Sequence, residues 1–166
     1  FVAYILLILF FRLAWKQIKS FQVKNQGEKN STFITVIIPA RNEALHLPAL
    51  LDSLKKQTYP AHLFEVLVID DHSKDDTAEI AQSFSVCRLI SLKDVIGAEV
   101  INSYKKKAIE TGIRESKGTL IVTTDADCIV KSYWLQTIAS FYESMHPSLI
   151  VMPVVMKDGM KPIEIF

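Results

Sequence analysis

From residue 33 onward, short runs of apolar residues alternate with segments whose apolar residues recur at helical spacing. The apolar runs are too short for helices, so they predict buried strands at 33–38, 64–69, 86–90, 120–124 and 149–155. The intervening segments predict helices at 43–58, 73–84, 104–116 and 133–145. Strands that are apolar on both faces and alternate with helices predict an α/β fold, with a mostly parallel sheet and helices on both faces.

Some of these helices carry further signals. The segment 43–58 has a leucine stripe and is ended by Tyr59-Pro60. Ser73 and Asp76 have the spacing of a capping box, which predicts that Ser73 begins the helix at 73–84. In the helix at 104–116, one set of residues is expected to face the core, namely Ala108, Ile109, Gly112 and Ile113.

The N-terminal part of the chain has a different pattern. Residues 1–11 are uniformly apolar or aromatic, Arg12 interrupts them, and Trp15 lies where interfacial aromatic residues are common. Basic residues then follow, so we expect a transmembrane helix over 1–18 whose C-terminal flank faces the cytoplasm. A linker is expected over 19–32 and a folded domain over 33–166. A buried helix of a larger soluble core is the alternative. Because the chain starts with Phe1 rather than Met, we expect it to be an internal piece of a longer protein.

Charge and cysteine content narrow the classes of partner. The formal net charge is +1, so no charge excess points to nucleic acid. Cys87 and Cys128 lie in no Cys-x-x-Cys or Cys/His cluster, so neither a zinc site nor a disulfide framework is predicted.

Three polar clusters follow three of the predicted strands, at 39–43, 70–76 and 125–127. In open parallel sheets, ligands bind outside the carboxyl ends of the strands. Three separate segments therefore bring acidic side chains to one edge of the sheet, and we expect the binding site there.

Asp125 and Asp127 flank one small residue directly after a strand, so in extended backbone their side chains would point in similar directions. Such a pair suits Mg²⁺ or Mn²⁺, which combine one or two carboxylates with the phosphates of a substrate. An ordinary polar loop with solvated acids is the alternative.

Other polar residues at this edge have two interpretations each. Asp70 and Asp71 can accept hydrogen bonds from a nucleobase or a ribose, or can help to cap the next helix. Glu43 suits the N-terminus of its own helix whether or not it touches a ligand. Lys105 lies on the inner edge of its helix and can reach a phosphate or a base carbonyl.

Four of these segments, in this order, resemble the motifs of family 2 glycosyltransferases. Residues 36–43 (VIIPARNE) resemble the opening strand and loop of that family, and residues 68–77 (VIDDHSKDDT) resemble its Asp-Asp-x-Ser-x-Asp-x-Thr motif. Lys105-x-x-Ala108 with Gly112 is similar to its Lys-x-x-Ala-x-Asn-x-Gly helix, although Glu110 stands where Asn is usual. Residues 124–127 (TDAD) resemble its Asp-x-Asp metal motif.

The resemblance implies a GT-A fold, which is Rossmann-like, and a nucleoside-diphosphate-sugar donor. It implies that the nucleoside is bound between Asp70 and the loop that contains Pro39, Ala40, Arg41 and Glu43. Asp125 would contact the ribose or sugar side and share with Asp127 the binding of a divalent metal, Mg²⁺ or Mn²⁺. The reaction would invert the anomeric carbon.

Inverting transfer needs a general base, which in this family is an acid of a later motif, followed by Gln-x-x-Arg-Trp. Nothing after Asp127 matches either motif, since the remaining acids, Glu143, Asp158 and Glu164, have no supporting pattern. We therefore expect the catalytic base to lie outside this chain, and the chain alone to bind donor weakly and not to turn over.

The family analogy and the expected topology suggest a cell-envelope polysaccharide or lipid acceptor and a plasma-membrane location, with the domain in the cytoplasm. Three other classes stay open at this point. A receiver domain of a response regulator would use Asp70, Asp71 and Asp125 as its acids, but a strand and an acidic loop already precede Asp70. A membrane-anchored α/β module could hold a nucleotide without transferring anything. A nucleotidyltransferase would need a glycine-rich loop, which residues 39–43 lack.

Overall fold

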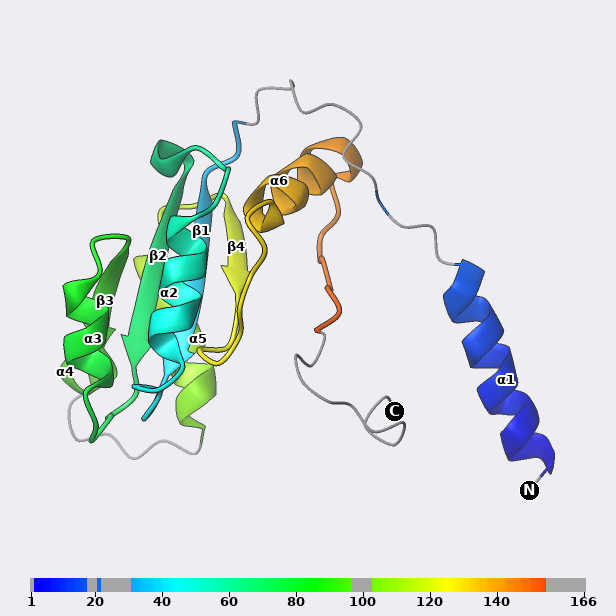
Figure 1. The fold of residues 1–166 in the computed structure, drawn as a ribbon, viewed down its shortest axis with the longest axis horizontal. Coiled ribbons are helices and arrows are strands. Elements are labelled where there is room, and N and C mark those ends of the chain that lie inside the picture. The colour runs from blue at the N-terminus through cyan, green and yellow to red at the C-terminus, as the bar shows by residue number, and fades with distance from the viewer. Residues whose placement is uncertain (1, 18–20, 22–30, 97–102, 155–166) are drawn as a thin grey trace.

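The computed structural model describes residues 2–17, 21, 31–96 and 103–154. A parallel four-stranded sheet forms its centre (Figure 1), and the strands lie in the order β3-β2-β1-β4. Their bounds are β1 (Ile34–Ala40), β2 (Phe64–Asp70), β3 (Cys87–Ser91) and β4 (Leu120–Thr123). The predicted α/β fold with a parallel sheet is confirmed.

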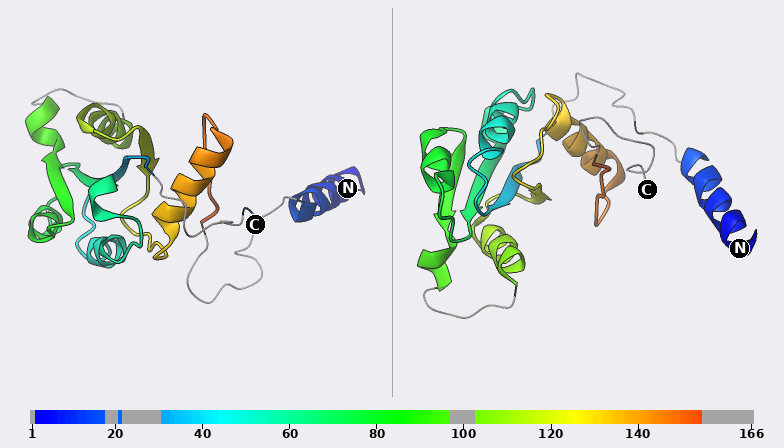
Figure 2. Two further views of the ribbon diagram at one scale, coloured as in Figure 1. Left: turned by 90° about the horizontal axis from the view of Figure 1, so that it is seen from above. Right: turned by 60° about the horizontal axis from the view of Figure 1, so that its bottom comes forward.

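Helices cover both faces of this sheet, as the sequence pattern predicts (Figure 2). One face carries α2 (Leu47–Lys55), α3 (Thr77–Ser83) and α6 (Trp134–Met145). The other face carries α4 (Leu92–Ile96) and α5 (Tyr104–Glu115). A short 3-10 helix, η1 (Ala61–Leu63), leads into β2.

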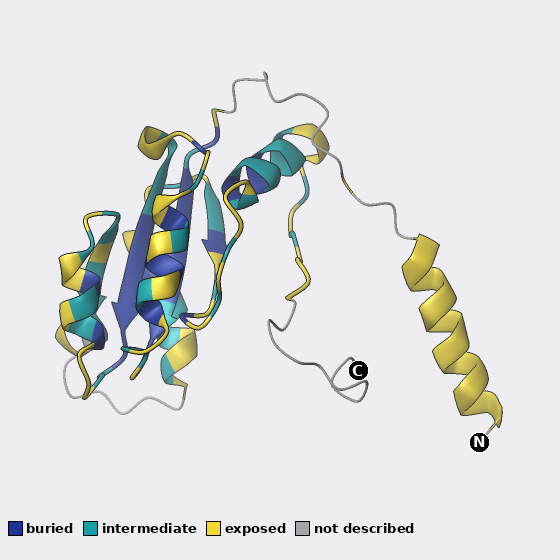
Figure 3. Cartoon of the chain, in the orientation of Figure 1, coloured by how far each residue is buried: buried dark blue, intermediate teal, exposed yellow. Residues whose placement is uncertain are grey.

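The alternation of side chains along β1 divides the core into two layers. Val36 and Ile38 pack with the leucine stripe of α2, whereas Ile37 between them packs with Ala108 of α5. All three strand residues are fully buried, and the central strands are the most buried part of the molecule (Figure 3). A strand that is buried on both faces reads as a continuous apolar run, which is why β1 has no polar alternation.

The strand β1 runs two residues further than predicted, through Pro39 to Ala40. Thr124 donates its N–H to the carbonyl of Ile37, so Ile37 and Pro39 turn their backbone groups toward β4. Because β4 pairs with β1 only as far as Ile37, the N–H that Pro39 lacks faces no strand partner. Proline is tolerated on such an unpaired strand side.

The helix α2 begins at Leu47 rather than at Glu43, so this part of the sequence prediction was wrong. Pro48 lies in the first turn of α2, where its fixed φ and missing N–H are tolerated. The carbonyl of Glu43 accepts the N–H groups of His46 and Leu47, which makes residues 43–46 a turn. Glu43 is thereby left in the loop after β1.

Two other expectations about elements fail. The predicted fifth strand over 149–155 is absent from its described part, 149–154, which has no regular structure. Pro153 interrupts this run and removes a ladder donor, and Leu149 and Val151 are exposed. In α5, Ile113 is also exposed, and the buried face is instead formed by Ala108, Thr111 and Gly112.

The N-terminal helix α1 (Val2–Gln17) is set apart from the sheet in Figure 1, and all 16 of its residues are exposed. At 1.5 Å per residue it is about 24 Å long, and a bilayer core is about 30 Å thick. Among the described helices, none is both long and apolar enough to cross a membrane.

Residues just before β1 are tied to α6. One carboxylate oxygen of Glu143 accepts hydrogen bonds from the backbone N–H groups of Ser31 and Thr32 and from the Thr32 hydroxyl. The Tyr59 hydroxyl donates to the Thr32 carbonyl at 2.6 Å, and burial raises the pKa of Tyr59 to about 12. Glu143 therefore has a structural role, while Asp158 and Glu164 lie outside the described residues.

Candidate functional site

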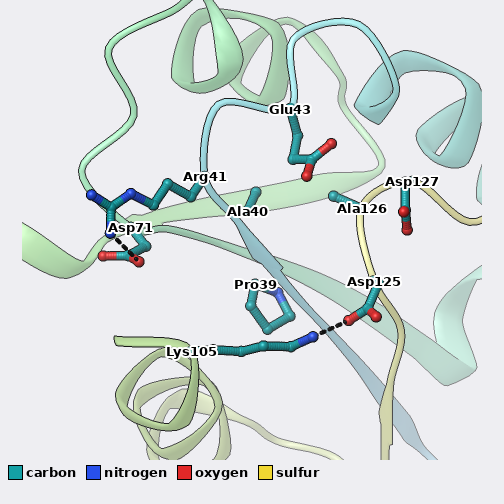
Figure 4. A pocket seen from close by; sticks show the side chains of 9 residues that line it. All are labelled: Pro39, Ala40, Arg41, Glu43, Asp71, Lys105, Asp125, Ala126 and Asp127. Carbon is teal, nitrogen blue, oxygen red and sulfur yellow. Dashed lines mark hydrogen bonds and ion pairs between the residues drawn. The ribbon is translucent and has the colours of Figure 1, made fainter. Parts of the chain in front are cut away.

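A cleft of about 340 Å³ lies at the carboxyl ends of β1, β2 and β4. The strand order reverses between β1 and β4, and such a switch point is where open α/β sheets bind ligands. Four chain segments contribute its walls (Figure 4), and the lining residues are Pro39, Ala40, Arg41, Glu43, Asp71, Lys105, Asp125, Ala126 and Asp127. The structure thus brings together nearly all the residues that the sequence singled out, and their roles toward a ligand remain predictions.

Asp70 is the predicted site residue that does not line this cleft. It is the last residue of β2, pairs in register with Ala40, and is only 8% exposed. Its Oδ1 has no hydrogen-bond partner among the described residues. A buried carboxylate oxygen without a donor is costly, so a ligand or a water molecule is expected to supply one.

Arg41 and Asp71 form one end of the cleft together with two residues that the sequence did not single out. Nη1 of Arg41 lies 3.5 Å from Oδ2 of Asp71, and its guanidinium lies 5.6 Å from the ring centroid of Tyr104. His72 Nδ1 lies 3.0 Å from the other Asp71 oxygen, and the His72 ring meets Tyr104 edge to face. These contacts fix the orientation of the largely buried Asp71, and only tertiary structure could reveal them.

Side chains of the loop after β2 satisfy successive backbone donors of the loop after β1. The N–H groups of Asn42, Glu43 and Ala44 donate to Ser73 Oγ, Thr77 Oγ1 and Asp75 Oδ2 respectively. In return, the N–H of Lys74 donates to Asn42 Oδ1 at 2.8 Å. We call this set of bonds the loop clamp. Its signal in the sequence is the alternation of Ser73, Asp75 and Thr77, whose side chains hold the cleft wall rather than a ligand.

The loop clamp replaces the capping box that the sequence predicted. The helix α3 begins at Thr77, and neither Ser73 nor the N-cap residue Asp76 caps it with a side chain. Asp75 does so instead, because its Oδ1 accepts both the N–H and the hydroxyl of Thr77. These hydrogen bonds, that from the Thr77 hydroxyl foremost, lower the pKa of Asp75.

Asp125 and Asp127 lie on a turn that follows β4, and not on extended backbone. The strand ends at Thr123, and the N–H of Cys128 donates to the carbonyl of Asp125. The strand alternation used to align the two carboxylates therefore does not apply, although both acids line the same cleft (Figure 4). Ala126 between them is buried, and it anchors the turn to the core.

Lys105 approaches the acids from α5. Its Nζ lies 2.7 Å from Oδ1 of Asp125, and both side chains are more than half exposed. Lys105 thus lines the cleft, and its contact with a phosphate or a base carbonyl remains a prediction.

The fit of these residues to a divalent metal can be judged from their chemistry. Within the described residues, no group of three or more His, Cys, Asp or Glu side chains could hold a metal ion by itself. Mg²⁺ and Mn²⁺ sites that use one or two carboxylates are completed by phosphate oxygens of a substrate. Asp125 and Asp127 fit a site of this shared kind, and not a closed protein cage.

Comparison with known proteins identifies the class. Residues 35–163 match Glycosyl transferase family 2, and the chain therefore belongs to this family. Glycosyltransferase AglE of Haloferax volcanii is 39% identical over 104 residues, which cover 63% of this chain and 33% of that protein. The dolichyl-phosphate beta-glucosyltransferase of Dictyostelium discoideum is 32% identical over 117 residues, covering 63% of this chain and 34% of the relative. The chain spans about a third of the length of these curated relatives.

A solved structure supports the same fold. The S. aureus TarS 1-349 crystal structure in complex with UDP-GlcNAc matches with a TM-score of 0.62 at 27% identity, covering 77% of this chain and 36% of TarS 1-349. The sheet is thus of the GT-A-like α/β type that the motifs implied. Membership of this family overturns the receiver-domain and nucleotidyltransferase alternatives.

Proposed function

We propose that this chain forms the donor-binding part of a glycosyltransferase that uses a nucleoside-diphosphate sugar. The observation that carries the proposal is the cleft at the switch between β1 and β4, which is lined by carboxylates from three loops and by a lysine of α5. The position of the cleft, its charged side chains and the family membership together support a nucleoside-diphosphate sugar as the ligand. The solved relative TarS was crystallised with UDP-GlcNAc.

The nucleoside would lie against the loops after β1 and β2. The unpartnered Oδ1 of Asp70 suits an N–H of the base or a ribose hydroxyl. The wall formed by Pro39, Ala40 and Arg41 is continuous with β1, and the loop clamp fixes the residues that directly follow it, so little ordering cost would remain on binding.

The diphosphate would lie toward Lys105, Asp125 and Asp127. The two aspartates would hold Mg²⁺ or Mn²⁺ together with phosphate oxygens. When bound, the metal would supply charge neutralisation to the diphosphate leaving group. The protein's own residues would orient the two carboxylates toward the metal and place the Lys105 ammonium beside the diphosphate.

The acceptor would be a lipid or a polysaccharide, and transfer would proceed with inversion. One relative is named for its action on dolichyl phosphate, which supports a lipid phosphate as the acceptor class. Inversion needs a base for the acceptor. Among the described residues we assign no such base, because Glu143 is engaged with Ser31 and Thr32 and the cleft acids suit the donor and its metal.

We also propose that α1 binds the cytoplasmic face of the plasma membrane and brings the cleft to a membrane-bound acceptor. All of its residues are exposed, and they are apolar or aromatic except for Arg12, Lys16 and Gln17, which lie toward its C-terminal end. An apolar helix that ends in basic residues suits an anionic lipid surface.

Calorimetric titration of the chain with UDP and with GDP, each with and without Mn²⁺, tests the donor site. Asp127→Asn should weaken metal-dependent binding about tenfold or more, because contacts to charged groups contribute about 1.5–3 kcal/mol. Asp52→Asn is the matched control, since Asp52 is exposed on α2 outside the cleft. Equal binding by Asp127→Asn and Asp52→Asn would rule out the proposed metal site.

A further inference from the structure

The ion pair between Lys105 and Asp125 joins two segments that the proposed function would use separately. Nζ of Lys105 lies 2.7 Å from Oδ1 of Asp125, with exposed fractions of 64% and 58% for the two side chains. Asp125 is one of the two proposed metal ligands, and Lys105 is the proposed contact of the diphosphate. In the structure, the Lys105 ammonium and the Asp125 carboxylate therefore pair with each other (Figure 4).

The charges that line the cleft show what this pair does. Four carboxylates and two cationic side chains line it, which leaves a formal charge of −2. Arg41 is engaged with Asp71 at one end, and Lys105, the other cation that lines the cleft, pairs with Asp125. A divalent ion alone must displace the ammonium from Asp125, and a diphosphate alone meets a net negative wall.

We propose that Lys105 couples the binding of the divalent metal to the binding of the diphosphate, an inference that rests on the proposed function. In the ligand-free cleft, the ammonium is the counter-ion of Asp125 and weakens the binding of a metal ion by itself. When metal and diphosphate are both present, Asp125 turns to the metal and the ammonium turns to a diphosphate oxygen. The cleft thereby favours the metal-diphosphate complex over either component.

The size of the effect follows from the exposure of the pair. An exposed ion pair of this kind changes an affinity by up to about fivefold. By linkage, the factor by which metal raises diphosphate affinity equals the factor by which diphosphate raises metal affinity. A single coupling factor therefore describes how the two ligands affect each other. Removing Lys105 should change both the effect of metal on diphosphate affinity and the effect of diphosphate on metal affinity.

Lys105→Met tests the proposal, with Lys106→Met as the matched control because Lys106 is exposed on the same turn of α5 and is not a cleft residue. Binding of Mn²⁺ alone is measured by the electron paramagnetic resonance signal of the free ion. Binding of UDP and GDP is measured by calorimetry with and without Mn²⁺, which yields the coupling factor. Thermal unfolding of both variants checks that the fold is intact.

In Lys105→Met, we expect the affinity for Mn²⁺ alone to rise about threefold to fivefold and the coupling factor to fall by at least the same amount. Lys106→Met should change neither quantity. Unchanged Mn²⁺ affinity with weaker nucleotide binding would overturn the coupling and leave Lys105 as a plain phosphate contact. Absence of UDP and GDP binding by the unaltered chain with Mn²⁺ would instead overturn the proposed function itself.

Discussion

The hydroxyl of Thr77 accepts a hydrogen bond from the backbone N–H of Glu43 at 2.8 Å, which joins the start of α3 to the loop after β1. The same hydroxyl donates to Asp75, and Thr77 is fully buried. One side chain therefore links two of the loops that form the cleft.

Thr77→Val should destabilise the fold, because the valine keeps the shape and leaves the Glu43 N–H without an acceptor. A fully buried donor without a partner costs about 1–3 kcal/mol; this bond is partly buried, so a loss of about 1 kcal/mol is expected, which urea unfolding measures. Thr123→Val is the control, since Thr123 is exposed on β4 and a surface change is expected to stay within about 0.5 kcal/mol. Equal stability of the two variants would contradict the loop clamp.

The lowered pKa of Asp75 predicts a pH dependence of stability. Hydrogen bonds, that from the Thr77 hydroxyl foremost, hold its folded-state pKa below its ordinary value. Asp75 therefore stabilises the fold above its unfolded-state pKa of about 3.9, and this contribution is lost as the pH falls through the folded-state value.

The matching variant is Asp75→Asn, whose amide does not ionise. The gap in free energy of unfolding between the unaltered chain and Asp75→Asn should narrow as the pH is lowered from about 5 to about 3. Urea titrations at several pH values measure the gap. A gap that stays constant over this range would show that ionisation of the Asp75 carboxylate does not contribute to the stability of the fold.

Gly112 should not tolerate a side chain. A Cβ at this position would lie 2.5 Å from Cγ2 of Ile37, which is fully buried in β1. Gly112→Ala should therefore cost about 1–3 kcal/mol by overpacking, although alanine favours helices elsewhere. Adding Ile37→Ala should recover part of this loss, so the double mutant should be more stable than the sum of the single effects predicts. Additive effects in urea unfolding would contradict direct contact between α5 and β1 here.

Association of α1 with lipid can be measured by co-sedimentation with phosphatidylglycerol vesicles. Leu6→Ser combined with Leu13→Ser should lower the vesicle-bound fraction strongly, since each buried leucine contributes about 1.5–3 kcal/mol. Leu45→Ser removes a still more exposed leucine outside α1 and should leave binding unchanged. If Leu45→Ser has the larger effect, α1 is not the membrane contact.

The sequence predicted the cleft better than the details of the elements around it. Polar residues after β1, β2 and β4 had to meet, because the carboxyl ends of parallel strands share one edge. Three of the errors in element bounds lie at prolines, whose effect on a helix or strand depends on the neighbouring residues. Pro39 stays within β1 because its N–H side is unpaired, Pro48 sets the start of α2, and Pro153 interrupts the predicted last strand.

The loop clamp and the cluster around Tyr104 could not be predicted in the same way. The sequence predicted that Ser73 and Asp76 begin a helix, because local capping is a common use of such residues. The structure instead pairs Ser73, Asp75 and Thr77 with backbone groups that lie 31 to 34 residues earlier in the chain. Likewise, Arg41 and Tyr104 become neighbours only when α5 packs across β1 and β2.

Amide chemical shifts of the ¹⁵N-labelled chain, recorded as UDP or GDP is added with Mg²⁺, test directly whether the cleft holds a nucleoside diphosphate. We predict shifts concentrated at the amides of Ala40, Arg41, Asp71, Lys105 and 125–127, and weaker shifts without Mg²⁺. No shifts at saturating nucleotide, or shifts confined to the groove between α2 and residues 129–132, would contradict it.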